Sequence, residues 1–285
     1  MVLVTLLWST AGVITRQLEQ ARSFEITFWR SFFTVLALFL ILPLLSGREV
    51  FGKIRAGGRM LWISGACWCG MFTFFMLALT LTSTANVLVT LALAPLMTAL
   101  AARLFIGHKL PGRTWAAIVI TGMGIAYMYV SQLSDGISLT GTLLALCVPL
   151  SGAANWTVSQ HAHTKGQDVD LMPAVLIGAA VSCLITLPFA WPLDASRHDL
   201  ALLGLLGFLQ LGLPCALAVL CARVLKAADI ALLCLLEVIF GIGLAWVGAG
   251  EVPSLNVILG AGVVLLALAT NEWLGRQQGL AKFSG

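Results

Sequence analysis

The chain carries at residues 60–102 the run MLWISGACWCGMFTFFMLALTLTSTANVLVTLALAPLMTALAA, which contains no Asp, Glu, Lys or Arg. A helix that crosses a bilayer needs about 20 apolar residues, so these 43 residues are long enough for about two crossings. Further charge-free runs occupy residues 114–134, 136–164, 171–193, 200–222 and 252–271. The repetition of such runs predicts a protein that crosses a membrane many times.

The composition of the whole chain supports this interpretation. Of its 285 residues 60% are hydrophobic and only 10% are charged, whereas an ordinary soluble domain has about 25% charged residues. So little polar surface cannot cover a globule in water. The fold class that we expect is an all-α integral membrane protein.

Apolar runs read against turn residues predict ten transmembrane helices, because the runs are continuous and lack the alternation of membrane strands. The expected ranges are about 1–15, 24–45, 60–82, 85–105, 113–132, 138–161, 171–191, 199–222, 229–249 and 254–274.

The basic residues indicate the orientation of these helices. With the N-terminus inside, the inner loops and the C-terminal tail hold most Lys and Arg, and the outer loops hold only Arg16, Arg22 and Arg197. Lys and Arg concentrate in cytoplasmic loops, so we expect both termini in the cytoplasm, in a bacterial-type inner membrane. The net charge of +4 follows from this bias, and no nucleic-acid partner is needed to explain it. The sequence sets no oligomeric state, and a monomer is compatible with it.

The two halves of the chain repeat weakly. Ala85-Asn86 is followed nine residues later by Ala94-Pro95, and Ala228-Asp229 is followed at the same spacing by Glu237-Val238. Several other pairs recur in the same order. Because each half holds five helices, an odd number, the second copy must enter the membrane inverted. We expect two inverted five-helix repeats, at residues 1–134 and 135–285.

The chain resembles the EamA branch of the drug/metabolite transporter superfamily. The residues that carry the resemblance are Leu7-Trp8-Ser9-Thr10, Arg30-Ser31-Phe32, Leu236-Glu237-Val238 and Gly250-Glu251-Val252-Pro253. The resemblance implies ten helices in two inverted repeats, and the first of these motifs is similar to the opening of amino-acid exporters of this branch. The chain departs from the family at Val238, where a proline is usual, and at Ala94, where the first repeat lacks an acid.

Glu237 is the one acidic side chain deep inside an apolar run, about 12 Å along a helix from Asp229 at 1.5 Å per residue. That depth is near the middle of a bilayer core about 30 Å thick. A carboxylate there costs several kcal/mol unless it faces a wet or polar interior. We therefore expect Glu237 to titrate or to meet a substrate ammonium; the alternative is a protonated acid held within the helix packing.

The same depth count places other candidate residues near the middle of the membrane, where transporters bind solutes between broken helices. The residues predicted to bind substrate are Trp8, Ser9, Phe72, Phe75, Asn155, Trp156, Gln210 and Glu237. Pro95, Pro149 and Pro214 are predicted to kink helices or to gate. The aromatic rings among them could instead face lipid or fill the packing. Arg30 is interpreted as a structural residue whose stem snorkels to the outer surface.

No nucleotide-binding signature appears in the sequence, and no paired carboxylates or Ser/His/Asp group is placed for catalysis. Neither Cys67-Trp68-Cys69 nor His161-Ala162-His163 is expected to bind a metal. We expect no enzyme activity, no metal and no cofactor, with a small-molecule substrate and the lipid bilayer as the partners.

The expected function is secondary or facilitative transport that exports small metabolites by alternating access, with amino acids of broad specificity as the first choice. Two alternatives stay open: an exporter of hydrophobic cationic drugs, and an integral membrane enzyme that acts on lipid. A lipid enzyme would be expected to gather its polar residues at one membrane surface, whereas the candidates here gather at mid-depth.

Overall fold

The computed structural model describes residues 1–47, 49–106, 111–130, 138–164, 172–222 and 227–283, and within these ranges the chain forms helices and no strand. The helices of the first half are α1 (Val2–Thr15), α2 (Ser23–Ser46), α3 (Val50–Ala56), α4 (Arg59–Leu81), α5 (Thr84–Leu91), α6 (Ala94–Ile106) and α7 (Gly112–Val130). Those of the second half are α8 (Leu139–Thr164), α9 (Met172–Ala190), α10 (Arg197–Leu205), the π-helix η2 (Leu206–Gly212), α11 (Leu213–Ala222), α12 (Ala227–Ala249) and α13 (Leu255–Phe283).

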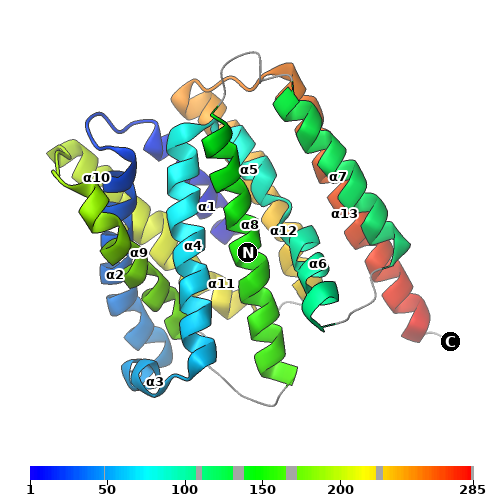
Figure 1. Cartoon of the computed structure of the whole chain (residues 1–285), viewed down its shortest axis with the longest axis horizontal. Helices are drawn as coiled ribbons and strands as arrows, with labels where there is room; N and C mark the ends of the chain where they lie inside the picture. Colours follow the sequence, from blue (N-terminus) through cyan, green and yellow to red (C-terminus); the bar gives the residue numbers. More distant parts are fainter. Residues whose placement is uncertain (48, 107–110, 131–137, 165–171, 223–226, 284–285) are drawn as a thin grey trace.

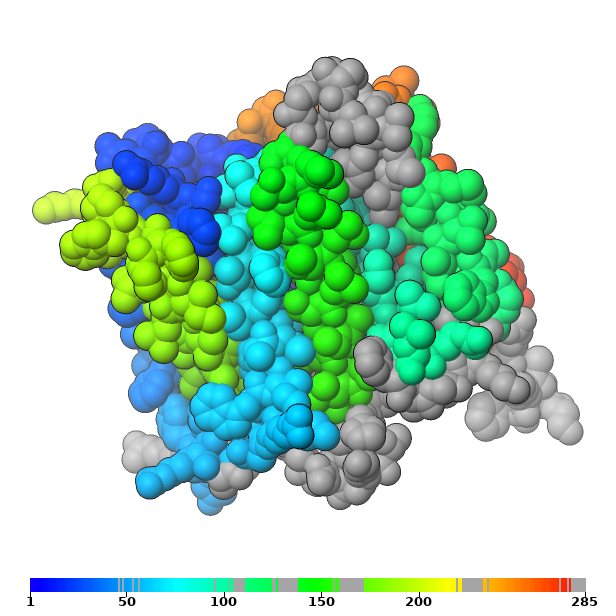
Figure 2. Space-filling view, viewed as in Figure 1, coloured from blue at the N-terminus to red at the C-terminus, as the bar shows by residue number. Residues whose placement is uncertain are grey.

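The helices form one bundle in which the two halves of the chain pack against each other (Figure 1). α4 lies between α8 and α9, as the space-filling view of that face also shows (Figure 2). α1 packs along α12, and α2 packs along α9. α7 and α13 run side by side at one edge of the bundle (Figure 1). The helices of one half are therefore buried largely by helices of the other.

Six helical segments are long and apolar enough to cross a membrane, within the part of the chain that the structure describes. They are Ser23–Leu45, Arg59–Leu81, Thr84–Ala101, Met172–Ala190, Arg197–Ala218 and Leu255–Gly275. Many large apolar side chains stay exposed on the outside of the bundle, such as Leu44 at 84% exposed. An apolar surface of this extent is unfavourable in water, whereas contact with lipid tails leaves it without that cost. The chain is a multi-pass membrane protein, and the count of ten crossings stays a prediction.

The structure follows the predicted helix ranges and adds one short helix, α3, between the second and third of them. It also interrupts two of the predicted helices. The fourth breaks at Ala92 and Leu93, between α5 and α6, directly before Pro95. Proline has no N–H and its ring crowds the carbonyl four residues earlier, so Pro95 makes no hydrogen bond to the carbonyl of Leu91, the residue at which α5 ends.

The second interruption lies in the predicted helix 199–222, where η2 separates α10 from α11. Pro214 cannot donate to the carbonyl of Gln210, and the backbone N–H of Leu213 donates instead to the carbonyl of Phe208, five residues back. That wider spacing is the hydrogen-bond pattern of a π-helix, which occurs mostly at functional sites. α8, in contrast, runs from Leu139 to Thr164 through Pro149 without interruption.

Buried acids fasten the loops of the two halves together at the end of the bundle that the charge bias predicts to be outside. The Asp199 carboxylate accepts hydrogen bonds from the backbone N–H groups of Glu19, Gln20 and Ala21, at 2.9, 2.9 and 3.0 Å. Glu25 accepts from the backbone N–H of Ala195 at 2.8 Å. These contacts hold the α1–α2 loop against the start of α10.

Candidate functional site

The π-helical segment brings one side chain of the second half into contact with the first half. Gln210 on η2 is 2% exposed, and its Nε2 donates a hydrogen bond to the backbone carbonyl of Trp8 on α1 at 3.2 Å. Its Oε1 has no hydrogen-bond partner among the residues that the structure describes. A buried acceptor without a partner costs about 1–3 kcal/mol. Gln210 therefore presents a free acceptor where the helical hydrogen bonding is already irregular.

Aromatic and charged residues of four other helices lie near Cys215 on α11. Cys215 is 2% exposed and packs in one cluster with Phe72 and Trp8, and the Trp8 side chain hydrogen-bonds its sulfur. Arg30 on α2 and Glu237 on α12 both lie within electrostatic range of this sulfur. The fold thus gathers a cation, an acid and two aromatic rings around one buried position.

Arg30 does not snorkel, so its interpretation as an outward-reaching structural residue is wrong. It is 2% exposed, and its guanidinium lies 5.5 Å from the centroid of the Phe75 ring. Its Nε and Nη1 atoms have no hydrogen-bond partner among the described residues. A cation–π contact contributes about 0.5–2 kcal/mol, less than the several kcal/mol that burying a charge costs. Arg30 is therefore a buried charge that Phe75 alone does not compensate.

The remaining predicted residues fall in different surroundings. The Asn155 Oδ1 accepts a hydrogen bond from the Ser64 hydroxyl at 2.6 Å, which joins α8 to α4. The Ser9 hydroxyl donates to the carbonyl of Leu6 in its own helix at 2.7 Å. The side chain of Trp156 lies outside the described part of the chain. The substrate roles of these residues stay predictions.

A chain of hydroxyl groups that the sequence interpretation missed crosses three helices. The Ser182 hydroxyl on α9 lies 3.0 Å from that of Ser31 on α2 and 2.8 Å from that of Thr73 on α4. Scattered Ser and Thr residues in apolar runs gave no signal in the sequence, because only the packing shows which of them meet. These hydrogen bonds join α2, α4 and α9 at Ser31, the residue that follows Arg30 on α2.

Two pockets open elsewhere in the described residues. A pocket of about 160 Å³ lies between α5, α12 and the α12–α13 loop, and its lining includes Ala85, Ile242, Ala245 and Glu251. A groove of about 390 Å³ runs between α7 and α13. Ile242 and Ala245 follow Glu237 along α12, so the first pocket lies toward the predicted outer end. The predicted mid-depth cavity stays a prediction.

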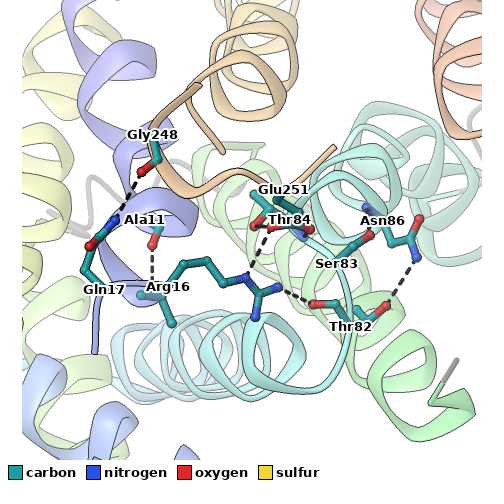
Figure 3. A network of polar contacts seen from close by, with 10 residues as sticks. Ala11, Arg16, Gln17, Thr82, Ser83, Thr84, Asn86, Gly248 and Glu251 are labelled. Carbon is teal, nitrogen blue, oxygen red and sulfur yellow. Dashed lines mark hydrogen bonds and ion pairs between the residues drawn. The ribbon is translucent and has the colours of Figure 1, made fainter. Parts of the chain in front are cut away.

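A polar network lies beside the first pocket (Figure 3). The Glu251 carboxylate accepts from the backbone N–H of Thr84 at 2.6 Å and from its hydroxyl at 2.8 Å, and it pairs with Nε of Arg16 at 3.2 Å. Arg16 also donates through Nη2 to the carbonyl of Thr82 at 2.8 Å. We refer to these contacts of Arg16, Thr82, Thr84 and Glu251 as the outer network. It joins the end of α1, the α4–α5 turn and the α12–α13 loop.

Comparison with known proteins agrees with this architecture. One solved crystal structure is similar to this chain, with a TM-score of 0.66 at 19% sequence identity. The match covers 97% of this chain and 96% of the chain in that structure. At that identity the likeness shows the fold alone. No curated protein matches the chain. The model of the EamA-like transporter family matches twice, at residues 1–130 and 139–271. Because these matches span most of both halves, the chain belongs to the EamA-like transporter family, whose members are membrane transporters of small molecules.

Proposed function

We propose that this protein is a secondary or facilitative carrier that exports small amphipathic metabolites, with amino acids as the first class, by alternating access. The observation that carries the proposal is Gln210, whose buried amide joins an irregular segment of the second half to Trp8 of the first. Irregular backbone at membrane depth is tolerated only where it is buried in protein or lines a cavity. In transporters built from repeats, such interruptions occur at the solute site.

The break before Pro95 supports the same proposal, because it gives the first half an interrupted helix as well. The repeat boundaries at residues 1–134 and 135–285 and the inversion of the second repeat belong to this proposal. In such a carrier the two halves rock against each other around a fixed site. Trp8, Phe72, Gln210 and Glu237 are then the residues that contact the solute.

Uptake by the purified protein in liposomes tests this function. The panel includes labelled leucine, phenylalanine, alanine and glutamate, a cationic dye, and a fluorescent phospholipid whose breakdown would be detected. We expect protein-dependent uptake of apolar amino acids above that of protein-free liposomes. Uptake of the dye alone would favour the drug exporter, and breakdown of the phospholipid would favour a lipid enzyme. Either result would overturn the proposal.

The proposed orientation has both termini in the cytoplasm, with α3 on the inner side and the α1–α2 loop on the outer side. We expect a membrane-impermeant maleimide added to intact cells to label a cysteine at Gln20 and to leave one at Gly57 unlabelled. Both variants are made on a background without the seven native cysteines. Permeabilised cells provide the control, since Gly57→Cys must then react. Labelling of Gly57→Cys in intact cells would contradict the proposed orientation.

A further inference from the structure

Arg30 is a buried cation, and two of its three guanidinium nitrogens make no hydrogen bond within the described part of the chain. It lies inside α2 at 2% exposed, and neither Nε nor Nη1 has a partner among the described residues. A guanidinium stays charged at every accessible pH. The Phe75 ring, 5.5 Å from the guanidinium carbon, offers its face but no hydrogen-bond acceptor. Phe75 therefore contacts the Arg30 guanidinium but leaves the Nε and Nη1 donors without a hydrogen-bond acceptor among the described residues.

The nearby acids do not supply the missing partner. Glu25, on the same helix, directs its Oε1 to the backbone N–H of Ala195 at 2.8 Å and to the Trp29 ring nitrogen at 3.3 Å. Glu237 and Arg30 both lie within electrostatic range of the Cys215 sulfur. Neither acid pairs with Nε or Nη1 of Arg30. A negatively charged group from outside the chain would satisfy these two donors.

A carboxylate has the chemistry that the position requires. Its two oxygens match the planar donors of a guanidinium, and the charge on both partners strengthens the bonds. The cluster around Cys215 also includes the carboxyl group of Glu237 within electrostatic range. Gln210, whose Oε1 has no partner among the described residues, lies beside the cluster, because its Nε2 donates to the backbone carbonyl of Trp8. Apolar rings of Trp8 and Phe72 lie in the same cluster. A cation, an acceptor pair and apolar walls are the complement of a zwitterion with an apolar side chain.

We propose that Arg30 is the carboxylate-binding group of the transport site, and that the protein therefore prefers zwitterionic or anionic amphipathic substrates over hydrophobic cations. This assignment rests on the proposed carrier function. A bound cation would meet the uncompensated charge of Arg30, whereas a carboxylate removes that cost. Arg30 is thus the residue that decides between amino acids and cationic drugs.

The test uses the purified full-length protein in detergent and measures ligand-dependent stabilisation from intrinsic tryptophan fluorescence on heating. The probes are leucine, leucinamide, which lacks the carboxylate, and 4-methylpentanoate, which lacks the amine. We expect leucine to bind at least tenfold more tightly than leucinamide. Arg30→Gln should weaken leucine and 4-methylpentanoate by at least tenfold and leave leucinamide unchanged, and Arg30→Lys should retain part of the affinity. Arg22→Gln is the matched control, because Arg22 lies at the start of the same helix with its side chain 74% exposed.

Two outcomes overturn the assignment. Equal binding of leucine and leucinamide by the unaltered protein would do so without any variant, and so would equal weakening of all three ligands by Arg30→Gln. Failure of the carrier function gives a different result. If leucine does not bind but 4-methylpentanoate binds in an Arg30-dependent manner, the anion site stands and the amino-acid substrate is wrong. If no carboxylate stabilises the protein at all, Arg30 has no such site.

Discussion

Glu251→Gln is expected to open the outer end of the protein. A cysteine placed in the pocket beside the outer network should then react with maleimide about tenfold faster. The Glu251 carboxylate accepts two hydrogen bonds from Thr84 and one from Arg16. Hydrogen bonds to charged groups each contribute about 1.5–3 kcal/mol, and partial exposure reduces this, since the Arg16 and Glu251 side chains are 32% and 20% exposed. A net loss of about 1.4 kcal/mol shifts a two-state population tenfold.

The measurement is the labelling rate of a single cysteine at Ala245, which is 2% exposed and lines the pocket between α5 and α12. An impermeant maleimide added outside should react about tenfold faster when Glu251→Gln is present. Asp194→Asn provides the matched control. It makes the same acid-to-amide change in the Arg22–Asp194 pair, whose side chains are 74% and 48% exposed, and exposed pairs contribute little.

A double-mutant cycle separates the outer network from a general loosening of the fold. If Arg16 and Glu251 act through each other, Arg16→Gln and Glu251→Gln together should accelerate labelling no more than the stronger of the two alone. Additive effects, or an Asp194→Asn rate equal to that of Glu251→Gln, would mean that these contacts do not hold the outer end closed.

Glu237→Gln is expected to remove most transport activity while the protein still folds. Gln is nearly isosteric with Glu and keeps a hydrogen-bonding group, so the packing of α12 is preserved. It cannot ionise, so it can neither exchange a proton nor neutralise a substrate ammonium. We expect at least a tenfold loss of uptake in liposomes, or the loss of any pH dependence between about pH 5 and pH 8.

The control for this variant is Glu19→Gln, which alters an exposed acid in the α1–α2 loop and should transport like the parent. Both variants should match the parent in elution volume and thermal midpoint. Uptake by Glu237→Gln that equals the parent at every pH would remove Glu237 from the mechanism and leave it as a packing acid.

The helices were predictable from the sequence because a helix that crosses a membrane needs a long, continuous run of apolar residues. Long apolar runs without charge are typical of membrane helices. The predicted ranges agree with the observed helices to within a few residues, apart from the short α3, the two interruptions and α13, which continues to Phe283 beyond the predicted end at 274. Pro95 lies next to the first interruption, where it cannot donate a hydrogen bond to the carbonyl of Leu91. The π-helix before Pro214 was harder to foresee, because a proline in an apolar run does not by itself predict that pattern: α8 continues through Pro149 as an α-helix.

The surroundings of individual side chains were less predictable, since the sequence gives the depth of a residue but not the rotation of its helix. Arg30 and Trp8 were both assigned to depths from the same kind of count. Trp8 does pack against Phe72 and Cys215, whereas Arg30 points inward and not along the helix to the surface. The partner of Asn155 on α4, and the meeting of Arg16 with Glu251, 235 residues apart, depend wholly on tertiary packing.

Counterflow in liposomes tests the central claim, that this chain is a carrier working by alternating access, most directly. Liposomes with the purified protein are loaded with unlabelled leucine and diluted into a trace of labelled leucine. A carrier exchanges internal for external substrate, so the label should rise transiently above its equilibrium level and then decline, and Glu237→Gln should abolish the rise. Label that only approaches equilibrium, at the rate of protein-free liposomes, would contradict the account.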